Sequence, residues 1–237
     1  ARRAQRTHRN SRRHRPLRLR RQQGPVAGHG PPGRSPRLVT RRANRRPRRE
    51  RQTDGGGISC YFSTLNLENV IITDNSSNNG GGIIFRGGYN SSLENVTISG
   101  NTAQYSGGGI YCFNGSNPIL VNSIVSDNAG NYGIYVESGN PSITYSNFYN
   151  NENGNFYNAG DWIGINVTTN ANGDSVDTYY NIQENPYFVN PNNNDYHLQN
   201  WSGLIGAGTT TNAPTTDIEG NPRPNPSGTN PDIGAYE

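Results

Sequence analysis

A unit of roughly 25 residues recurs along the chain, and this repetition constrains the fold more than any other feature of the sequence. Three copies open with Gly-Gly-Gly-Ile, a weaker fourth opens with Gly-Ile, and each copy closes with an asparagine. The copies occupy residues 55–75, 80–101, 107–128 and 133–151. Alignment on the isoleucine gives Ile58, Ile83, Ile110 and Ile134, which are 25, 27 and 24 residues apart. A period of this kind predicts a solenoid, in which each copy forms one coil and stacks on the next.

Residues inside each copy alternate in the way that a β-strand requires, with successive side chains on opposite faces. The inward face predicted for the first strand carries, two positions after the isoleucine, Cys60, Phe85, Cys112 and Val136. A second short strand shows the same alternation, for example at Val70 and Ile72, and Leu67 precedes it. No segment places apolar residues at a sustained helical spacing. The sequence therefore predicts an all-β fold, a parallel β-helix with coils about 4.8 Å apart.

Asparagines and cysteines occupy equivalent positions in successive copies. Asn69, Asn95 and Asn122 fall between two predicted strands, where a sharp corner needs a residue that tolerates a positive φ. We therefore expect these asparagines to be structural, and stacked asparagines can also hydrogen-bond along a column. Cys60 and Cys112 share one inward column but lie two coils apart, which is about 10 Å. That separation exceeds the reach of a disulfide, so we expect two free, buried thiols.

The motifs of the chain resemble those of a known family. The recurring pattern L-x-N-V-x-I-x-x-N followed by GGGI resembles right-handed parallel β-helix proteins of the pectin-lyase-like superfamily. Three C-terminal motifs resemble choice-of-anchor Q domain proteins, which are secreted bacterial β-helix proteins: NPYFVNPNNNDYHLQ (185–199), DIEGNPRP (217–224) and PDIGAYE (231–237). The resemblance covers roughly residues 54–237 and implies a right-handed solenoid, secretion or display at the cell surface, and a groove along the first strands that holds substrate in related enzymes.

Residues 1–53 differ in composition from the rest of the chain. They hold 19 of the 21 basic residues and one acidic residue, a net charge of +18, whereas residues 54–237 carry a net charge of −14. Three interpretations remain open: a basic arm that binds polyanions, a targeting peptide without the usual apolar core, or a stretch translated out of frame. The segment lacks the apolar residues needed to fold, so we expect a disordered tail. Its charge is no sign that the fold binds specific nucleic acid.

The remaining chain divides into two further parts. Residues 54–158 contain the coils, and residues 159–237 lose the repeat and should form irregular last coils and a C-terminal cap over the final coil. Short strands are expected at residues 187–189 and 196–198, around a turn at 190–194. No run of 18 apolar residues is present, so no membrane span is expected. We also expect a monomer that is a fragment of a larger extracellular protein.

Residues suited to catalysis are scarce. The chain has no lysine, and residues 54–237 contain two arginines, Arg86 and Arg223, so a base for a polysaccharide lyase is hard to identify. Glu68 and Glu94 share an outward column, where a solvated ladder is a better interpretation than an acid/base pair. His197 stands alone among residues 54–237, and no pattern of metal ligands or nucleotide-binding loop is visible. The sequence therefore predicts no catalytic residues, no metal and no cofactor.

The best candidate site is an outward surface of the first strand of each coil. We expect this surface to carry the candidate glycan-binding residues Tyr61, Arg86, Tyr111, Phe113 and Tyr135. Exposed aromatic rings stack on sugars, and Tyr111 and Tyr135 should contribute most because they are adjacent in one column. The structural alternative is packing of these side chains against one another. These observations favour a non-catalytic structural or adhesive module that binds polysaccharide or a cell-surface glycan, and the alternative function is a polysaccharide lyase or glycoside hydrolase.

Overall fold

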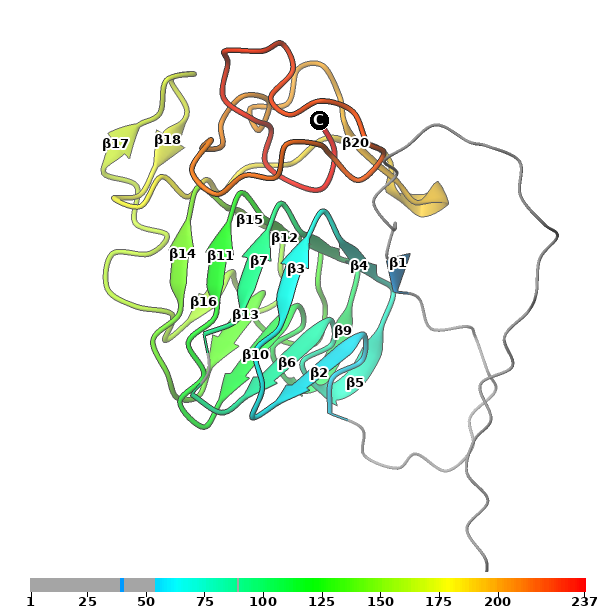
Figure 1. Ribbon diagram of the computed structural model, residues 1–237. Helices are drawn as coiled ribbons and strands as arrows, with labels where there is room; N and C mark the ends of the chain where they lie inside the picture. The colour runs from blue at the N-terminus through cyan, green and yellow to red at the C-terminus, as the bar shows by residue number, and fades with distance from the viewer. Residues whose placement is uncertain (1–38, 41–53, 89) are drawn as a thin grey trace, which may run out of the picture. The chain divides into compact units, whose positions relative to one another are not determined.

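Three parallel β-sheets wrap around one narrow core (Figure 1). The computed structural model describes residues 39–40, 54–88 and 90–237. The first sheet contains β2 (Ile58–Tyr61), β6 (Ile83–Arg86), β10 (Ile110–Phe113), β13 (Ile134–Val136) and β16 (Phe156–Tyr157). The second sheet contains β3 (Asn66–Glu68), β7 (Ser92–Glu94), β11 (Ile119–Val121) and β14 (Ser142–Thr144). The third sheet contains β1 (Val39–Thr40), β4 (Ile71–Thr73), β8 (Thr97–Ser99), β12 (Ile124–Ser126) and β15 (Asn147–Tyr149).

Shorter strands complete the fold. A separate parallel pair joins β5 (Ser76–Asn79) to β9 (Thr102–Ser106). The C-terminal part contains two antiparallel hairpins, β17 (Thr168–Thr169) with β18 (Ser175–Val176), and β19 (Phe188–Asn190) with β20 (Asp195–Leu198). A 3₁₀ turn, η1 (Pro191–Asn193), lies between β19 and β20. No α-helix occurs in the described residues, and the predicted all-β solenoid is confirmed.

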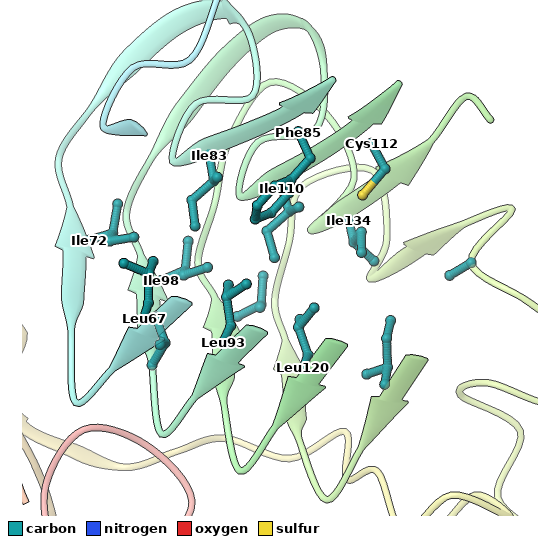
Figure 2. Close-up of a cluster of buried hydrophobic side chains, with 14 of the residues drawn as sticks. Leu67, Ile72, Ile83, Phe85, Leu93, Ile98, Ile110, Cys112, Leu120 and Ile134 are labelled. Carbon is teal, nitrogen blue, oxygen red and sulfur yellow. The ribbon is translucent and has the colours of Figure 1, made fainter. Parts of the chain in front are cut away.

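The register of the first sheet confirms the alignment of the repeats. Ile58 pairs with Ile83, Ile83 with Ile110, and Ile110 with Ile134. The last three are fully buried and Ile58 is partly buried, as expected for one inward column at the first described coil. Figure 2 shows Ile83, Ile110 and Ile134 pointing into the interior of the coils. Leu67, Leu93 and Leu120 of the second sheet point into the same interior from the opposite side. Cys60 and Cys112 are both buried and free, and Phe85 lies between them in the register.

The glycine triplets allow the coils to stack closely. The first glycine of a triplet, such as Gly80 with φ 63°, adopts a left-handed conformation that disfavours side chains. The second glycine faces the next coil, so that a Cβ on Gly81 would lie 2.3 Å from the carbonyl oxygen of Gly108. The third faces the core, where a Cβ on Gly82 would lie 2.9 Å from Cγ2 of Ile98. The first glycine therefore permits the turn, the second permits close spacing of the coils, and the third leaves room for core side chains.

Gly81→Ala should destabilise the protein more than Gly115→Ala does. A methyl group at Gly81 meets backbone atoms of Gly108 and Thr102 that cannot rotate away, so we expect a loss of about 2–3 kcal/mol. Gly115 has φ 76° but open space around it, so alanine there should cost about 1 kcal/mol through backbone strain alone. Urea denaturation of both variants measures the difference, and equal losses would contradict the role of close backbone approach.

Two asparagine columns have different functions in the fold. The corner residues Asn69, Asn95 and Asn122 have φ values of 52°, 54° and 48°, which confirms the predicted turn. The continuous side-chain ladder instead runs through the asparagines that close each copy. The Nδ2 group of Asn101 donates to Oδ1 of Asn128 at 3.1 Å, and that of Asn128 donates to Oδ1 of Asn151 at 2.9 Å. Amide hydrogen bonds thus join successive coils within the interior.

The C-terminal part covers the flank of the coils as well as their end. Ile71 on β4 and Ile124 on β12 point outward from the third sheet, yet both are buried. They belong to a second apolar cluster with Val176, Ile182, Phe188, Tyr196, Leu204, Ala207, Ile218, Ile233, Ala235 and Tyr236. The predicted C-terminal cover therefore extends beyond the final coil and reaches earlier coils. An outward apolar face needs a cover along the whole sheet, and the C-terminal chain supplies it.

The arginine-rich segment contributes one described strand. Val39 and Thr40 form β1, which pairs in parallel with Ile71 and Ile72 of β4. Within the expected disordered tail, these two residues pair with the exposed backbone edge that β4 offers. The rest of this segment lies outside the described residues.

Candidate functional site

An arginine held between two aromatic rings forms the centre of the candidate site. The parallel register places Tyr61, Arg86 and Phe113 side by side on β2, β6 and β10, with their side chains on the outer face of the first sheet. The guanidinium carbon of Arg86 lies 5.2 Å from the ring centroid of Tyr61 and 4.7 Å from that of Phe113. Cation–π attraction of this kind fixes the guanidinium group without neutralising its charge. No carboxylate among the described residues forms an ion pair with Arg86.

Tyrosine rings continue the site toward the later coils. Tyr135 on β13 stacks on Tyr157 on β16, with ring centroids 4.3 Å apart and an interplanar angle of 9°. Tyr132 packs against both rings at centroid distances of 6.2 and 5.3 Å. Tyr157 is 42% exposed, whereas Tyr135 is half-buried. The stacked pair therefore presents one ring to solvent, and the other supports it.

Tyr111 is part of the support and offers little surface to a ligand. It is 7% exposed, and its ring packs against Phe113 and Tyr135 at centroid distances of 6.0 and 5.8 Å. Its hydroxyl group donates to the carboxylate of Glu137. Burial, followed by the contact with Glu137, raises the pKa of Tyr111. The expectation that Tyr111 presents an open ring is therefore wrong, because neighbouring rings close over the middle of its column.

The five predicted residues thus lie on one face but differ in accessibility. Tyr61 is 41% exposed, and Arg86, Phe113 and Tyr135 are half-buried. Sequence reasoning missed Tyr157, because β16 lacks the glycine triplet that marks the earlier coils. The asparagine, aromatic and glycine residues of the sequence NGNFYN were the available signal. The accessible surface, which we call the outer aromatic face, consists of Tyr61, Arg86, Phe113, Tyr135 and Tyr157.

Glu68 and Glu94 are adjacent in register on the second sheet, as the sequence predicts. Glu68 is exposed and Glu94 half-buried. Burial, and then the charge of Glu68, raises the pKa of Glu94, while a hydrogen bond with Ser92 lowers it. This arrangement fits a partly solvated carboxylate ladder.

A second pair of carboxylates could not be found from sequence spacing. Asp174 Oδ1 and Glu184 Oε2 each lie 3.1 Å from the position that a Cβ atom on Gly203 would take, so both approach one point. Burial, and then the charge of Asp174, raises the pKa of Glu184. Three separate loops supply these residues, and their proximity depends on tertiary folding.

His197, the single histidine of residues 54–237, lies between two carboxylates. Its Nδ1 atom lies 2.6 Å from Oδ1 of Asp195, and its Nε2 atom lies 3.4 Å from Oε2 of Glu219. The imidazole also packs on Tyr236 at a centroid distance of 3.8 Å. Hydrogen bonding to His197 lowers the pKa of Asp195. These contacts tie β20 to the last residues of the chain, which is a structural role.

Arg223 is buried in a cluster of carboxylates. Its Nε atom lies 3.0 Å from Oε2 of Glu237, in an ion pair whose N–H direction is not aligned for a hydrogen bond. Asp217 accepts hydrogen bonds from the backbone N–H groups of Glu219, Asn221 and Glu237. Burial lowers the pKa of Arg223, and the surrounding carboxylates oppose this change. This geometry gives Asp217 and Arg223 a structural role.

The described residues contain neither a metal-binding cluster nor a membrane-spanning helix. No group of three or more His, Cys, Asp or Glu side chains in residues 54–88 and 90–237 is arranged to hold a metal ion. No helix in the described part of the chain has the length and apolar character needed to cross a membrane.

Comparisons with known proteins identify the repeat region. A family model described as "Right handed beta helix region" matches residues 51–201, which is more than half of the chain. No curated protein matches the sequence, and no solved structure matches it. The match spans every coil and the C-terminal part up to Trp201, including all residues of the outer aromatic face.

Proposed function

Because the chain belongs to the family of right-handed β-helix regions, we propose that it is a non-catalytic extracellular module of a bacterial surface or secreted protein. The module is of the choice-of-anchor Q type, as its three C-terminal motifs suggest. Its role is structural and adhesive, and its outer aromatic face binds polysaccharide or a cell-surface glycan.

The observation that carries this proposal is the guanidinium group of Arg86, which forms no ion pair with any carboxylate among the described residues. Residues 54–237 hold 16 acidic residues and two arginines, and the other arginine, Arg223, is buried in an ion pair. A half-buried arginine with no carboxylate partner in residues 54–88 and 90–237, in an otherwise acidic fold, suits a ligand that brings its own negative charge. The rings of Tyr61 and Phe113 on either side fix the guanidinium plane and offer apolar contact. Uronate and sulfated sugars combine an anion with an apolar ring face, so they match both features.

Tyr157 extends the proposed site along the solenoid axis. Neighbouring strands in a sheet are about 4.8 Å apart, so the three coils from Arg86 to Tyr157 span roughly 15 Å. This length suits a short oligosaccharide that contacts Arg86 at one end and the Tyr135–Tyr157 stack at the other. Tyr111 lies between these groups and supports the rings on either side.

Arg86→Gln should weaken the binding of acidic oligosaccharides about tenfold and leave neutral ones nearly unchanged, since it removes one charge-assisted contact. Tyr157→Ala should weaken both classes about tenfold through the loss of one stacking surface. Calorimetric titration with uronate-containing, sulfated and neutral oligosaccharides, chosen from a glycan array, measures both effects.

Two control variants sharpen this test. Arg86→Lys retains the charge but loses the planar group, so it should recover only part of the affinity for acidic sugars. Tyr179→Ala removes a tyrosine of similar exposure, 38%, outside the outer aromatic face, and should bind like the wild type. Equal weakening in Tyr179→Ala and Tyr157→Ala, or no effect of Arg86→Gln, would place any binding site elsewhere.

Glycoside hydrolysis is the second candidate function, and the convergence of Asp174 and Glu184 favours it. Glycosidases use two carboxylates about 5–10 Å apart, and a raised pKa suits the one that acts as an acid. Glu184 has the raised pKa of this pair. Release of reducing sugar, lost in Glu184→Gln, would support this function. Release of unsaturated uronates would indicate a lyase. The absence of both products would favour the non-catalytic binding module.

A further inference from the structure

The C-terminal residues 201–237, which we call the clasp, lie along the outer flank of the third sheet (Figure 1). The three corner asparagines attach the clasp to three successive coils. The Nδ2 group of Asn69 donates to the carbonyl oxygen of Thr216 at 2.7 Å, and that of Asn122 donates to Thr209 at 2.8 Å. Asn95 donates to the carbonyl oxygens of Gly234 and Asp232 at 3.1 and 3.2 Å.

The clasp contains no long strand, so few backbone ladders hold it in place. Its apolar residues Leu204, Ile218 and Ile233 pack in the cluster that covers Ile71 and Ile124. Gly234 lies so close to the sheet that a Cβ there would be 2.8 Å from Cδ1 of Ile124. The clasp is therefore a separate layer. It is attached through side-chain hydrogen bonds, the apolar cluster and a backbone hydrogen bond from the N–H of Gly234 to the carbonyl oxygen of Asn122 at 2.8 Å, and its release would expose an apolar sheet face.

One cation and three carboxylates of the clasp share a largely buried cluster. The side chains of Arg223 and Glu237 are fully buried, Asp217 has no exposed surface, and Asp232 is mostly buried. With all four groups ionised, the cluster carries an excess of two negative charges. Burying excess charge without a partner is unfavourable, and protonation of one carboxylate relieves it.

Hydrogen bonding identifies the carboxylate that takes the proton. Asp217 accepts three backbone N–H groups and the side-chain amide of Asn221. Glu237 accepts the backbone N–H groups of Asn225 and Asp232 and pairs with Arg223. Asp232 accepts only the N–H of Gly206, at 2.8 Å, among the described residues. The charge of Asp232 is thus compensated least, and each additional donor to a carboxylate favours its ionised form.

We infer that docking of the clasp onto the third sheet is linked to the uptake of one proton by Asp232, so that the clasp is held more tightly in acidic solution. The proton comes from solvent and resides on the carboxyl group of Asp232. Glu237 and Arg223 are the charged groups that act on the carboxyl group of Asp232, with opposite signs. On the coil side, the uncharged side chain of Asn95 holds the backbone carbonyl of Asp232. This inference does not depend on glycan binding at the first sheet.

The direction of the pH dependence follows from the cluster. Burial raises the pKa of Asp232 to about 6, above the ordinary value of 3.8, and the charge of Glu237 adds to this effect. A carboxyl group whose pKa is raised in the docked state stabilises docking fully when the pH is below the ordinary pKa of the group. That stabilisation is lost as the pH rises from about 4 to about 6. A difference of about two pKa units corresponds to at most about a hundredfold change in the docking equilibrium, and less where water reaches the group.

Hydrogen exchange of the full chain at pH 5 and pH 7.5, corrected for intrinsic rates, tests this linkage. Protection of clasp amides such as Ile218, Ile233 and Ala235 should be higher at pH 5 than at pH 7.5, by up to about tenfold. Ile124, whose amide bonds within the coils, should change less. In Asp232→Asn, clasp amides should show the same protection at both pH values, equal to that of the wild type at pH 5. Asp161→Asn, at an exposed acidic residue, should behave like the wild type.

Two outcomes would overturn the inference. The first is equal clasp protection of the wild type at both pH values. The second is a pH dependence that persists in Asp232→Asn and disappears in His197→Gln, which would assign the effect to the contact between His197 and Glu219. If Asp232→Asn does not fold, the ¹³C carboxyl resonance of Asp232 in the wild type decides instead. An apparent pKa near 6 supports the linkage, and a value near or below 4 rejects it.

Discussion

Ile110→Asp should abolish the cooperative unfolding transition of the coils. Ile110 has no exposed surface, and its register neighbours Ile83 and Ile134 are equally buried. A carboxylate there has no partner in an apolar column, and the cost of burying it is several kcal/mol. Typical domains have stabilities of about 5–15 kcal/mol, so one substitution would remove much or all of the total. Far-ultraviolet circular dichroism during heating measures the loss.

Matched substitutions separate burial from charge. Ile119→Asp introduces the same group on β11, where the isoleucine is 37% exposed, and should cost less than about 1 kcal/mol. Ile110→Val removes one methyl group from the core and should cost about 0.5–1.5 kcal/mol. A cooperative transition in Ile110→Asp with a midpoint close to that of Ile119→Asp would show that the inward column does not carry the stability of the coils.

The inward columns could be predicted because side-chain alternation along a strand directly specifies which face is buried. Ile83, Phe85 and Leu93 lie where the repeat places them, and the corner asparagine Asn95 has the positive φ that the turn requires. Each position of a coil has equivalents in the other copies of the repeat, so an ambiguous assignment at one position can be decided from the equivalent positions.

The outward columns could not be predicted in the same way. Burial of Tyr111 depends on rings from neighbouring coils, and burial of Ile124 depends on a clasp that begins 77 residues later in the chain. Asn122 forms a corner of its coil and also accepts a hydrogen bond from the backbone N–H of Thr209. Only the corner role can be recognised from the repeating sequence pattern. For the candidate site, the sequence therefore indicates the face that carries Arg86, and the fold decides which rings on it are accessible.

Asn128→Ala should destabilise the protein by about 4 kcal/mol or more, since it leaves several buried polar groups without partners at once. The Oδ1 atom of Asn128 accepts from the backbone N–H and the Nδ2 group of Asn101 at 3.0 and 3.1 Å. Its Nδ2 group donates to Oδ1 of Asn151 and to the carbonyl oxygen of Ile98 at 2.9 and 3.1 Å. Each orphaned group in the interior costs about 1–3 kcal/mol.

Asn153→Ala is the matched control, because Asn153 is exposed and should change stability by less than about 0.5 kcal/mol. Denaturant midpoints of the two variants measure the difference. The ladder joins successive coils, so its loss at Asn128 should also reduce amide protection at Asn101 and Asn151 while the separate hairpin β19–β20 keeps its protection. Equal stability of the two variants would mean that coil stacking depends on the apolar columns alone, and the asparagines then serve only to satisfy one another's hydrogen bonds.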